Sequence, residues 1–113
     1  MIISCGYEVQ RNLGFGFLEI VYKDALEWEF GQRGMYFERE KQYPVIYKGS
    51  QLAHSYFADF VIFESVILEV KSKREIARED QAQAINYLRC SRCKVGLILN
   101  FGTADMGIKR VIL

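Results

Sequence analysis

Apolar side chains at the start of the chain are spaced three or four residues apart, which places them on one face of an α-helix. This spacing predicts a first helix over residues 2–13, and the same period predicts a second over residues 18–33. The first stripe consists of Ile2, Cys5, Val9 and Leu13. The second consists of Leu18, Val21, Tyr22, Ala25, Leu26 and Phe30, and Gly31 and Gly34 follow it as a stop signal.

Beyond residue 35 the pattern changes to β-branched and aromatic runs, which predict strands. Strands are expected over residues 36–43, 45–47, about 51–63, 66–71, 95–100 and 107–113, with a turn at Lys48-Gly49-Ser50. Residues 78–89 indicate a third helix, buried through Ala82, Ile85 and Leu88. The order predicts an α/β fold, in which a central mixed sheet of four or five strands has helices on both sides.

The segment from Asp59 to Lys71 combines this strand pattern with charged residues. Side chains alternate along a strand, so Glu69 and Lys71 share a face. A three-residue hairpin loop centred on Glu64 would place Asp59 directly opposite Glu69. A two-residue loop at Glu64-Ser65 would instead put the carboxylates on opposite faces, unless a bulge restored the parity. We predict the three-residue loop.

Two carboxylates on one face of an apolar hairpin form a plausible site for a hard cation. Magnesium takes carboxylate and carbonyl oxygens, so Asp59, Glu69 and the carbonyl of Val70 are a candidate ligand set. A metal held there would lower the pKa of a bound water and offset charge on a phosphoryl group, and Lys71 could position that water. The competing interpretation is a pair of salt bridges on a solvated sheet face, the commoner fate of charges on strands.

Composition narrows the class of protein. The 113 residues predict one domain over 1–113, and 15 basic against 14 acidic residues argue against a nucleic-acid binder that relies on a charged tail. No apolar run is long enough for a membrane span, and the N-terminus lacks the features of a signal peptide. An odd number of cysteines does not suggest a disulfide scaffold, so a cytoplasmic location is expected.

Motifs along nearly the whole chain resemble one family. Gly16-x-x-Glu19-x-x-Tyr22 resembles the motif that names the GxxExxY proteins. The segments LGFGFLEIVYKDAL, LEVKS, QAQAINYL, VGLILNFG and IKRVIL resemble that family in the same order. The family belongs to the PD-(D/E)XK nuclease superfamily, whose core is a mixed sheet flanked by helices.

This resemblance implies a nuclease that depends on Mg²⁺, with Mn²⁺ as an alternative, and that acts on nucleic acid, with DNA as the expected substrate. Asp59, Glu69 and Lys71 match the catalytic signature, with Asp59, Glu69 and Val70 as metal ligands. Glu19 matches the acidic residue of the first core helix, and Gln83 with Tyr87 resembles the Gln-x-x-x-Tyr motif of RecB-like nucleases. Glu19 and Gln83 are thereby expected in catalysis, and Tyr22 and Tyr87 in substrate binding.

Each of these residues also has a simpler interpretation. Glu19 lies four residues before Lys23, as in an ordinary surface ion pair, and Gln83 with Tyr87 could be the polar flank of an amphipathic helix. Two departures from the family are visible. Ala58 stands where the signature has proline, and Gln10 stands where relatives commonly carry a histidine.

The cysteines and the neutral charge keep two other functions open. Cys5, Cys90 and Cys93 supply three thiolates, whereas an iron–sulfur cluster needs four, so free cysteines are expected. The main alternative to an enzyme is a non-catalytic module that uses a nuclease fold to bind nucleic acid or protein. Such a module could act as a homodimer. A redox protein is the weaker third possibility.

Overall fold

The structure is a computed structural model that describes all residues from Met1 to Leu113. It contains three helices and five strands. They are α1 (Ile2–Leu13), α2 (Glu19–Gln32), β1 (Phe37–Tyr47), β2 (Ser50–Ile62), β3 (Val66–Lys71), α3 (Arg78–Cys90), β4 (Val95–Asn100) and β5 (Gly107–Ile112).

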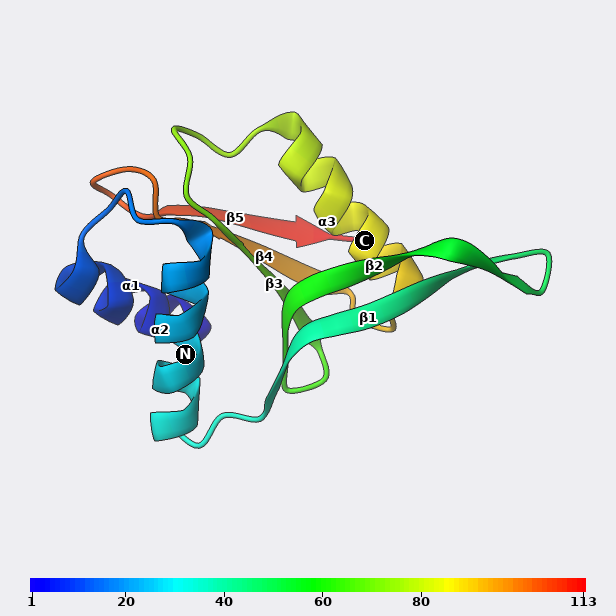
Figure 1. Cartoon of the computed structure of the whole chain (residues 1–113), viewed down its shortest axis with the longest axis horizontal. Helices are drawn as coiled ribbons and strands as arrows, with labels where there is room; N and C mark the ends of the chain where they lie inside the picture. Colours follow the sequence, from blue (N-terminus) through cyan, green and yellow to red (C-terminus); the bar gives the residue numbers. More distant parts are fainter.

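The five strands form one mixed sheet in the order β1-β2-β3-β4-β5 (Figure 1). Only β3 and β4 are parallel, because α3 carries the chain back across the sheet between them, and the other neighbours are antiparallel. Helices α1 and α2 cover one face and α3 covers the other. The predicted α/β fold, a mixed sheet with helices on both sides, is confirmed.

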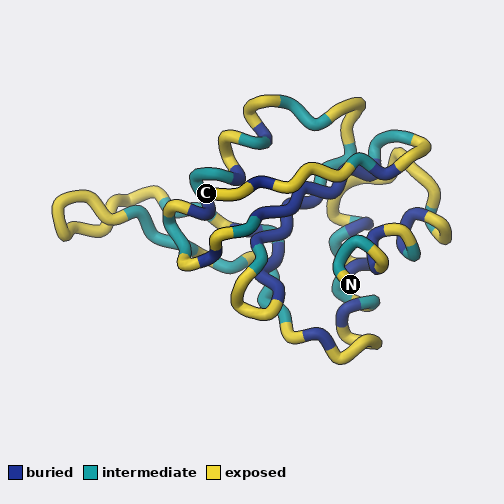
Figure 2. The backbone as a smooth tube through the Cα atoms, turned by 180° about the vertical axis from the view of Figure 1, so that it is seen from behind, coloured by how far each residue is buried: buried dark blue, intermediate teal, exposed yellow.

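Alternation along β3 explains how one sheet supports two cores. Leu68 and Val70 pack with α1 and α2, whereas Ile67 packs with Ala84 and Leu88 of α3. In the backbone trace of Figure 2 the buried residues concentrate in the middle strands. Because helices cover both faces of β3, a charged side chain on this strand, such as Glu69, is buried whichever face it points to.

Two residues that were predicted on the buried faces of helices are exposed. Leu18 is 75% exposed and has an extended backbone directly before the first residue of α2, Glu19. On α3, Ala82 is exposed, and the buried face instead contains Asp80, Ala84 and Tyr87. The helix is turned so that a carboxylate and a phenol face the sheet. An apolar stripe could not reveal this orientation, because these polar groups find polar partners there.

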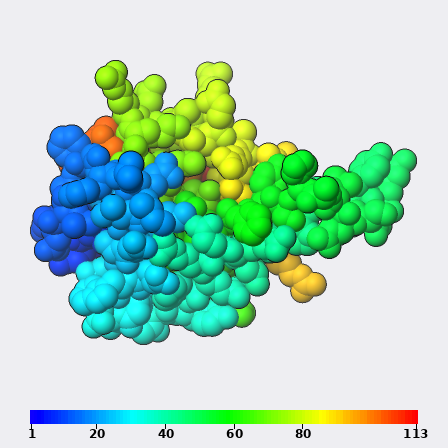
Figure 3. Space-filling model, in the orientation of Figure 1, coloured from blue at the N-terminus to red at the C-terminus, as the bar shows by residue number.

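Strand β1 continues through Pro44, where the sequence predicted two separate strands. Proline has no N–H to donate, but β1 is an edge strand and needs donors on one side only. The pairing with β2 shifts register between Pro44 and Ile46. Beyond the body of the protein, β1 and β2 continue together as a projecting ribbon (Figures 1 and 3).

None of the three helices is long and apolar enough to cross a membrane. The cytoplasmic location expected from the sequence stays a prediction.

Candidate active site

The hairpin between β2 and β3 brings the predicted carboxylates together. Its loop is the three residues 63–65, of which the first two have left-handed backbone. The regular pairing ends at Phe60 and Leu68, so Asp59 and Glu69 are the next residues along the two strands. The prediction of a three-residue loop is confirmed, and the two carboxylates lie next to each other where the pairing ends.

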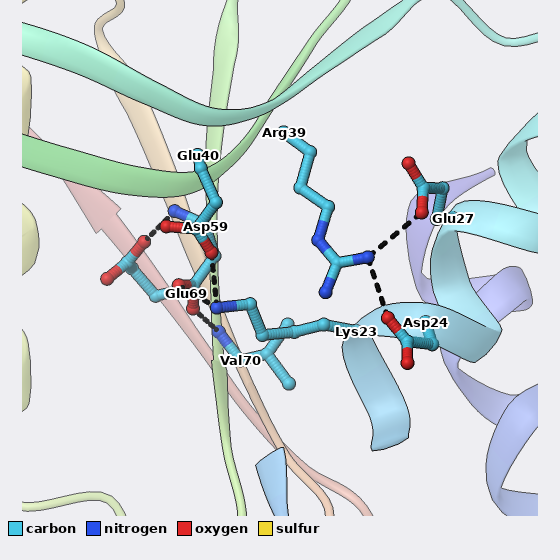
Figure 4. A network of polar contacts seen from close by, with 8 residues as sticks. All are labelled: Lys23, Asp24, Glu27, Arg39, Glu40, Asp59, Glu69 and Val70. Atoms are coloured by element: carbon cyan, nitrogen blue, oxygen red, sulfur yellow. Dashed lines mark hydrogen bonds and ion pairs between the residues drawn. The ribbon is translucent and has the colours of Figure 1, made fainter. Parts of the chain in front are cut away.

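At Asp59 and Glu69, side chains replace the backbone ladder (Figure 4). The Asp59 N–H donates a 2.8 Å hydrogen bond to the Glu69 carboxylate, and the Val70 N–H donates one of 2.8 Å to the Asp59 carboxylate. Each acid therefore accepts a hydrogen bond from the backbone of the opposite strand. These bonds fix both side chains in position.

The neighbouring strand β1 is interrupted at the same level. Glu40 would lie opposite Asp59, but the regular pairing covers only the flanking residues Arg39 and Lys41. The φ angle of Glu40 is 54°, a left-handed conformation that costs a residue with a side chain about 1–2 kcal/mol. Asp59 thus lies where its strand departs from regular pairing on both sides. Such local strain is characteristic of functional sites.

Lys23 of α2 supplies the cation that joins these acids. Its Nζ lies 2.5 Å from a Glu40 oxygen and 3.0 Å from an Asp59 oxygen, and its side chain is 13% exposed. Burial opposes the charged form, but the hydrogen bonds to Glu40 and Asp59 outweigh it and raise the pKa of Lys23. Lys23 therefore does not form the surface pair with Glu19 that its spacing suggested.

Arg39 fixes the same strand to α2 beside Lys23. Its guanidinium donates to Asp24 at 2.8 Å and to Glu27 at 2.9 Å (Figure 4). Two successive residues of β1, Arg39 and Glu40, are thus both ion-paired to one helix. These contacts hold β1 against α2 at the position where its ladder is broken.

Glu69 has no comparable cation. It is 4% exposed, and burial, reinforced by the negative charge of Asp59, raises its pKa to about 8. A buried carboxylate at this position disproves the interpretation of Glu69 as part of a salt bridge on a solvated face. It leaves a site where added positive charge would be strongly favoured.

Two residues of α3 approach this site. The Gln83 amide donates a 2.9 Å hydrogen bond to the Tyr87 hydroxyl, so the predicted pair on one helix face is formed. Tyr87 is buried, whereas Gln83 is exposed. Burial, together with the charges of Glu69 and Asp59, raises the pKa of the Tyr87 phenol. Tyr87 therefore remains a neutral hydrogen-bonding group beside the acids.

Lys71 lies at the end of β3 and faces α3. Its Nζ is 3.8 Å from Asp80, whereas that of Lys73 is 2.8 Å from the same carboxylate. Asp80 also accepts a 2.8 Å hydrogen bond from the Ala77 N–H at the start of α3. Burial opposes ionisation of Asp80, but Lys73 and the Ala77 N–H outweigh it and lower the pKa of this carboxyl.

The segment after Lys71 is held by the end of β4. The Asn100 side chain accepts from the Lys73 N–H at 3.0 Å and donates to the Lys73 carbonyl at 2.9 Å. A Cβ on Gly102 would lie 2.0 Å from the Lys73 carbonyl oxygen, so only glycine allows this close approach. These contacts fix the position of Lys71 relative to the carboxylates.

The two motif residues of the second helix have different surroundings. Tyr22 is fully buried, stacks on Phe101 at 4.4 Å, and donates a 2.8 Å hydrogen bond to the Gly14 carbonyl. Because no part of Tyr22 reaches the surface, its contacts organise the loop before α2 and leave none for a substrate. Glu19 is exposed and forms no ion pair with a basic residue. The hydrogen bond to Asp80 raises the pKa of Lys73, and the negative charge of Glu19 adds to this effect.

The donor set fits a hard divalent cation. No three Asp, Glu, His or Cys side chains of the chain converge, so a cation at this site would take two carboxylates, Asp59 and Glu69, from the protein, with the Val70 carbonyl as the further predicted ligand. Magnesium sites commonly use one or two carboxylates, with water and substrate phosphate completing the coordination. Cys5 and Cys93 belong to cores on opposite faces of the sheet, so the cysteines cannot ligate one cluster.

Sequence reasoning named Asp59, Glu69, Lys71, Gln83 and Tyr87 as site residues but did not name Lys23, Glu40 or Asp80. Lys23 and Glu40 lie beside Asp59, and Asp80 lies beside Lys71. Lys23 belongs to the segment LGFGFLEIVYKDAL, but Glu40 and Asp80 belong to none of the quoted motifs. A lysine four residues after a motif glutamate was the one available signal for Lys23.

Comparison with known proteins gives the family of the chain and a structure with a similar fold. The protein titled "Crystal structure of SSO0001" aligns with a TM-score of 0.64 and 17% identity, over 83% of this chain and 50% of that one. The chain thus spans half the length of that protein, and the likeness concerns the fold alone. No curated protein gives a significant match. The model of the PD-(D/E)XK nuclease superfamily, whose members typically use divalent metal ions, matches residues 1–111. The chain belongs to the PD-(D/E)XK nuclease superfamily.

Proposed function

We propose that this protein is a divalent-metal-dependent nuclease that hydrolyses phosphodiester bonds, with Mg²⁺ or Mn²⁺ as the metal and DNA as the substrate. The observation that carries the proposal is the junction of Asp59 and Glu69. Two carboxylates are fixed within hydrogen-bonding distance of each other's strand, and Glu69 is buried without an ion-pair partner. Lys71 follows two residues later on the same strand.

Asp59, Glu69 and the Val70 carbonyl would hold the metal, which when bound would offset phosphate charge and lower the pKa of a coordinated water. Lys71 orients the attacking water and stabilises the negative charge that develops on the phosphoryl group. It suits this role because its ammonium is part-exposed and Asp80 is 3.8 Å away, too far for a direct hydrogen bond.

Residues of the two flanking helices have supporting roles in this proposal. The exposed Gln83 amide, aligned by Tyr87, binds a substrate phosphate or base. Glu19 acts from the start of α2 on the Lys73 side of the site, where it orients water or substrate. Tyr22 supports catalysis only by holding the loop that precedes Glu19.

We further infer that the chain is a GxxExxY protein and RecB-like. The supporting observations are the Gly16-x-x-Glu19-x-x-Tyr22 motif and the hydrogen-bonded Gln83–Tyr87 pair on α3.

A non-catalytic binding module is the second candidate, and one observation favours it. Both oxygens of Asp59 already have partners, Lys23 and the Val70 N–H, as expected for a purely structural carboxylate. In such a module, the acids would hold the strand junction and nothing more.

Calorimetric titration of Mg²⁺ and Mn²⁺ separates these functions. We compare the wild type with an Asp59→Asn/Glu69→Gln double variant, which keeps hydrogen-bonding groups in place but removes both charges. The matched control is Asp24→Asn, which removes a nearby acid that contacts only Arg39. A nuclease binds metal in the wild type and the control but not in the double variant.

The same proteins are then incubated with labelled single- and double-stranded DNA and RNA. We expect Mg²⁺-dependent cleavage that is lost in the double variant, by a factor of about 10³ or more. Absence of cleavage in the wild type with every substrate, or equal cleavage in the double variant, would contradict the proposal.

A further inference from the structure

The ribbon formed by β1 and β2 leaves the body of the protein and is not covered by any other element. We call residues 43–56 the arm. It begins at the Tyr43–Tyr56 pair, which packs against α3, and it ends at the pairing of Tyr47 with Ser50. Residues 46–54 are all exposed (Figure 3). An isolated two-stranded hairpin is marginally stable in water, so this arm has the form of an element that meets a partner.

The charge of the arm selects the class of that partner. No acidic residue occurs between positions 41 and 58, and all 14 acids of the chain lie elsewhere. Lys48 at the tip pairs with no carboxylate, and its ammonium lies 5.5 Å from the centroid of the Tyr47 ring. His54 is exposed on the same ribbon. A surface with basic and aromatic groups and no acids suits a polyanion that carries stacked bases.

The arm is also continuous with the candidate active site. The Tyr56 ring meets the Tyr87 ring edge-on, with centroids 5.3 Å apart, and Tyr87 is adjacent to Glu69. Three residues after Tyr56, the same strand supplies Asp59. A ligand that follows β2 from the arm past Tyr56 would therefore reach the carboxylate pair.

We propose that the arm is a nucleic-acid-binding element, with Lys48 contacting phosphates and Tyr47 contacting a sugar or base. A two-stranded ribbon has the dimensions to enter the major groove of a duplex, and its aromatic side chains could equally stack on a single strand. The inference rests on the proposed function only for the class of substrate, because binding does not require catalysis.

A second copy of the chain is the competing occupant, since Ile46 and Leu52 are exposed on the arm. Two arms packed together would offer no acid of either arm to pair with Lys48 of the other, so charge complementarity between the copies is missing. The charge pattern therefore favours nucleic acid.

The test measures binding separately from cleavage. Fluorescence anisotropy is recorded with a labelled duplex and a single strand of the same sequence, in the presence of a chelator that prevents cleavage. Lys48→Glu is compared with Lys109→Glu, the same charge reversal at an exposed residue of β5, outside the arm. We expect Lys48→Glu to weaken binding about five- to tenfold at low salt and to reduce the salt slope by about one. Lys109→Glu should bind like the wild type.

Unchanged binding in Lys48→Glu, or equal losses in both variants, would overturn the inference. So would a concentration-dependent dimer, measured by sedimentation, that Ile46→Asp dissociates while DNA binding is unaffected. The Asp59→Asn/Glu69→Gln variant makes the two proposals distinguishable, because it should lose metal binding while retaining the arm-dependent affinity. Duplex and single-strand affinities then show which form the arm prefers.

Discussion

Two lysines flank the carboxylate pair, and they differ in how their charges are used. Lys23 on α2 forms ion pairs with Glu40 and Asp59 at 2.5 and 3.0 Å. Lys71 on β3 forms one ion pair, with Asp80 at 3.8 Å. Their side chains are almost equally exposed, at 13% and 18%, so burial does not explain the difference.

The comparison indicates that position relative to the broken ladder decides what each cation does. Lys23 compensates two acids at the strand junction and so stabilises the left-handed conformation of Glu40. The Lys71 ammonium has no close ion pair, so under the proposed function it is available to contact a substrate phosphate. One lysine is therefore expected to determine stability and the other to determine the reaction rate.

The largest effect is expected from Lys71→Met. Loss of a positioned charge that stabilises a transition state typically reduces the rate about 10²–10³-fold. We expect the rate of Mg²⁺-dependent cleavage to fall by a similar factor. Magnesium affinity, measured by calorimetry, should stay within about twofold, because Lys71 is not a ligand. Lys73→Met is the matched control. Lys73 and Lys71 both pair with Asp80, and Lys73 is the closer of the two.

The control should retain cleavage within about threefold of the wild type, well below the loss expected for a catalytic charge. Equal losses in the two lysine variants would show that Asp80 pairing, and not the charge at Lys71, matters for the reaction.

Lys23→Met should act on stability. Removing one partner of a part-buried ion pair leaves Glu40 and Asp59 uncompensated, so we expect a loss of about 2–3 kcal/mol in the free energy of unfolding, measured in urea. Added Mg²⁺ should raise the melting temperature of this variant more than that of the wild type, because the cation replaces the missing charge beside Asp59.

Arg39→Met is the control for this prediction. Arg39 also joins β1 to α2, but its partners do not contact Asp59; Asp24 is exposed and Glu27 is half-buried. It should cost about 1 kcal/mol or less and leave the response to Mg²⁺ unchanged. A response to Mg²⁺ that is the same in both variants would remove Lys23 from the carboxylate site.

The β2–β3 hairpin could be predicted because its rules are local. Strand period and loop length are local properties, so the possible loops could be reduced to two, and the predicted three-residue loop is the one observed. The same holds for the helix that pairs Gln83 with Tyr87, which needs only the spacing of one turn. Such contacts depend on residues close in the chain or joined by one tight turn.

Lys23, Glu40 and Asp80 could not be predicted in this way. The pairing of Lys23 with Asp59 joins residues 36 positions apart through the packing of α2 on the sheet. Glu40 lies in an ordinary strand pattern, and nothing in that pattern indicates a left-handed φ. Asp80 is buried on α3, and an apolar stripe could not indicate this because it predicts burial only for apolar residues.

The smallest effect, expected for Asp80→Asn, shows how firmly Asp80 is held by its partners. Its pKa is lowered in the folded state, so the carboxylate contributes stability above the pKa of the unfolded chain and loses it as the pH falls through the folded value. We therefore expect Asp80→Asn to cost about 1 kcal/mol at neutral pH and almost nothing near pH 2, measured by urea unfolding. Glu79→Gln changes the exposed neighbouring acid, and its free energy of unfolding should equal that of the wild type at both pH values. If Asp80→Asn lost as much free energy of unfolding at neutral pH as is expected for Lys23→Met, Asp80 would hold Lys71 as tightly as Asp59 holds Lys23. The contrast between the two lysines would then fail. If Asp80→Asn were still less stable than the wild type near pH 2, the loss of stability would be due to packing and not to charge.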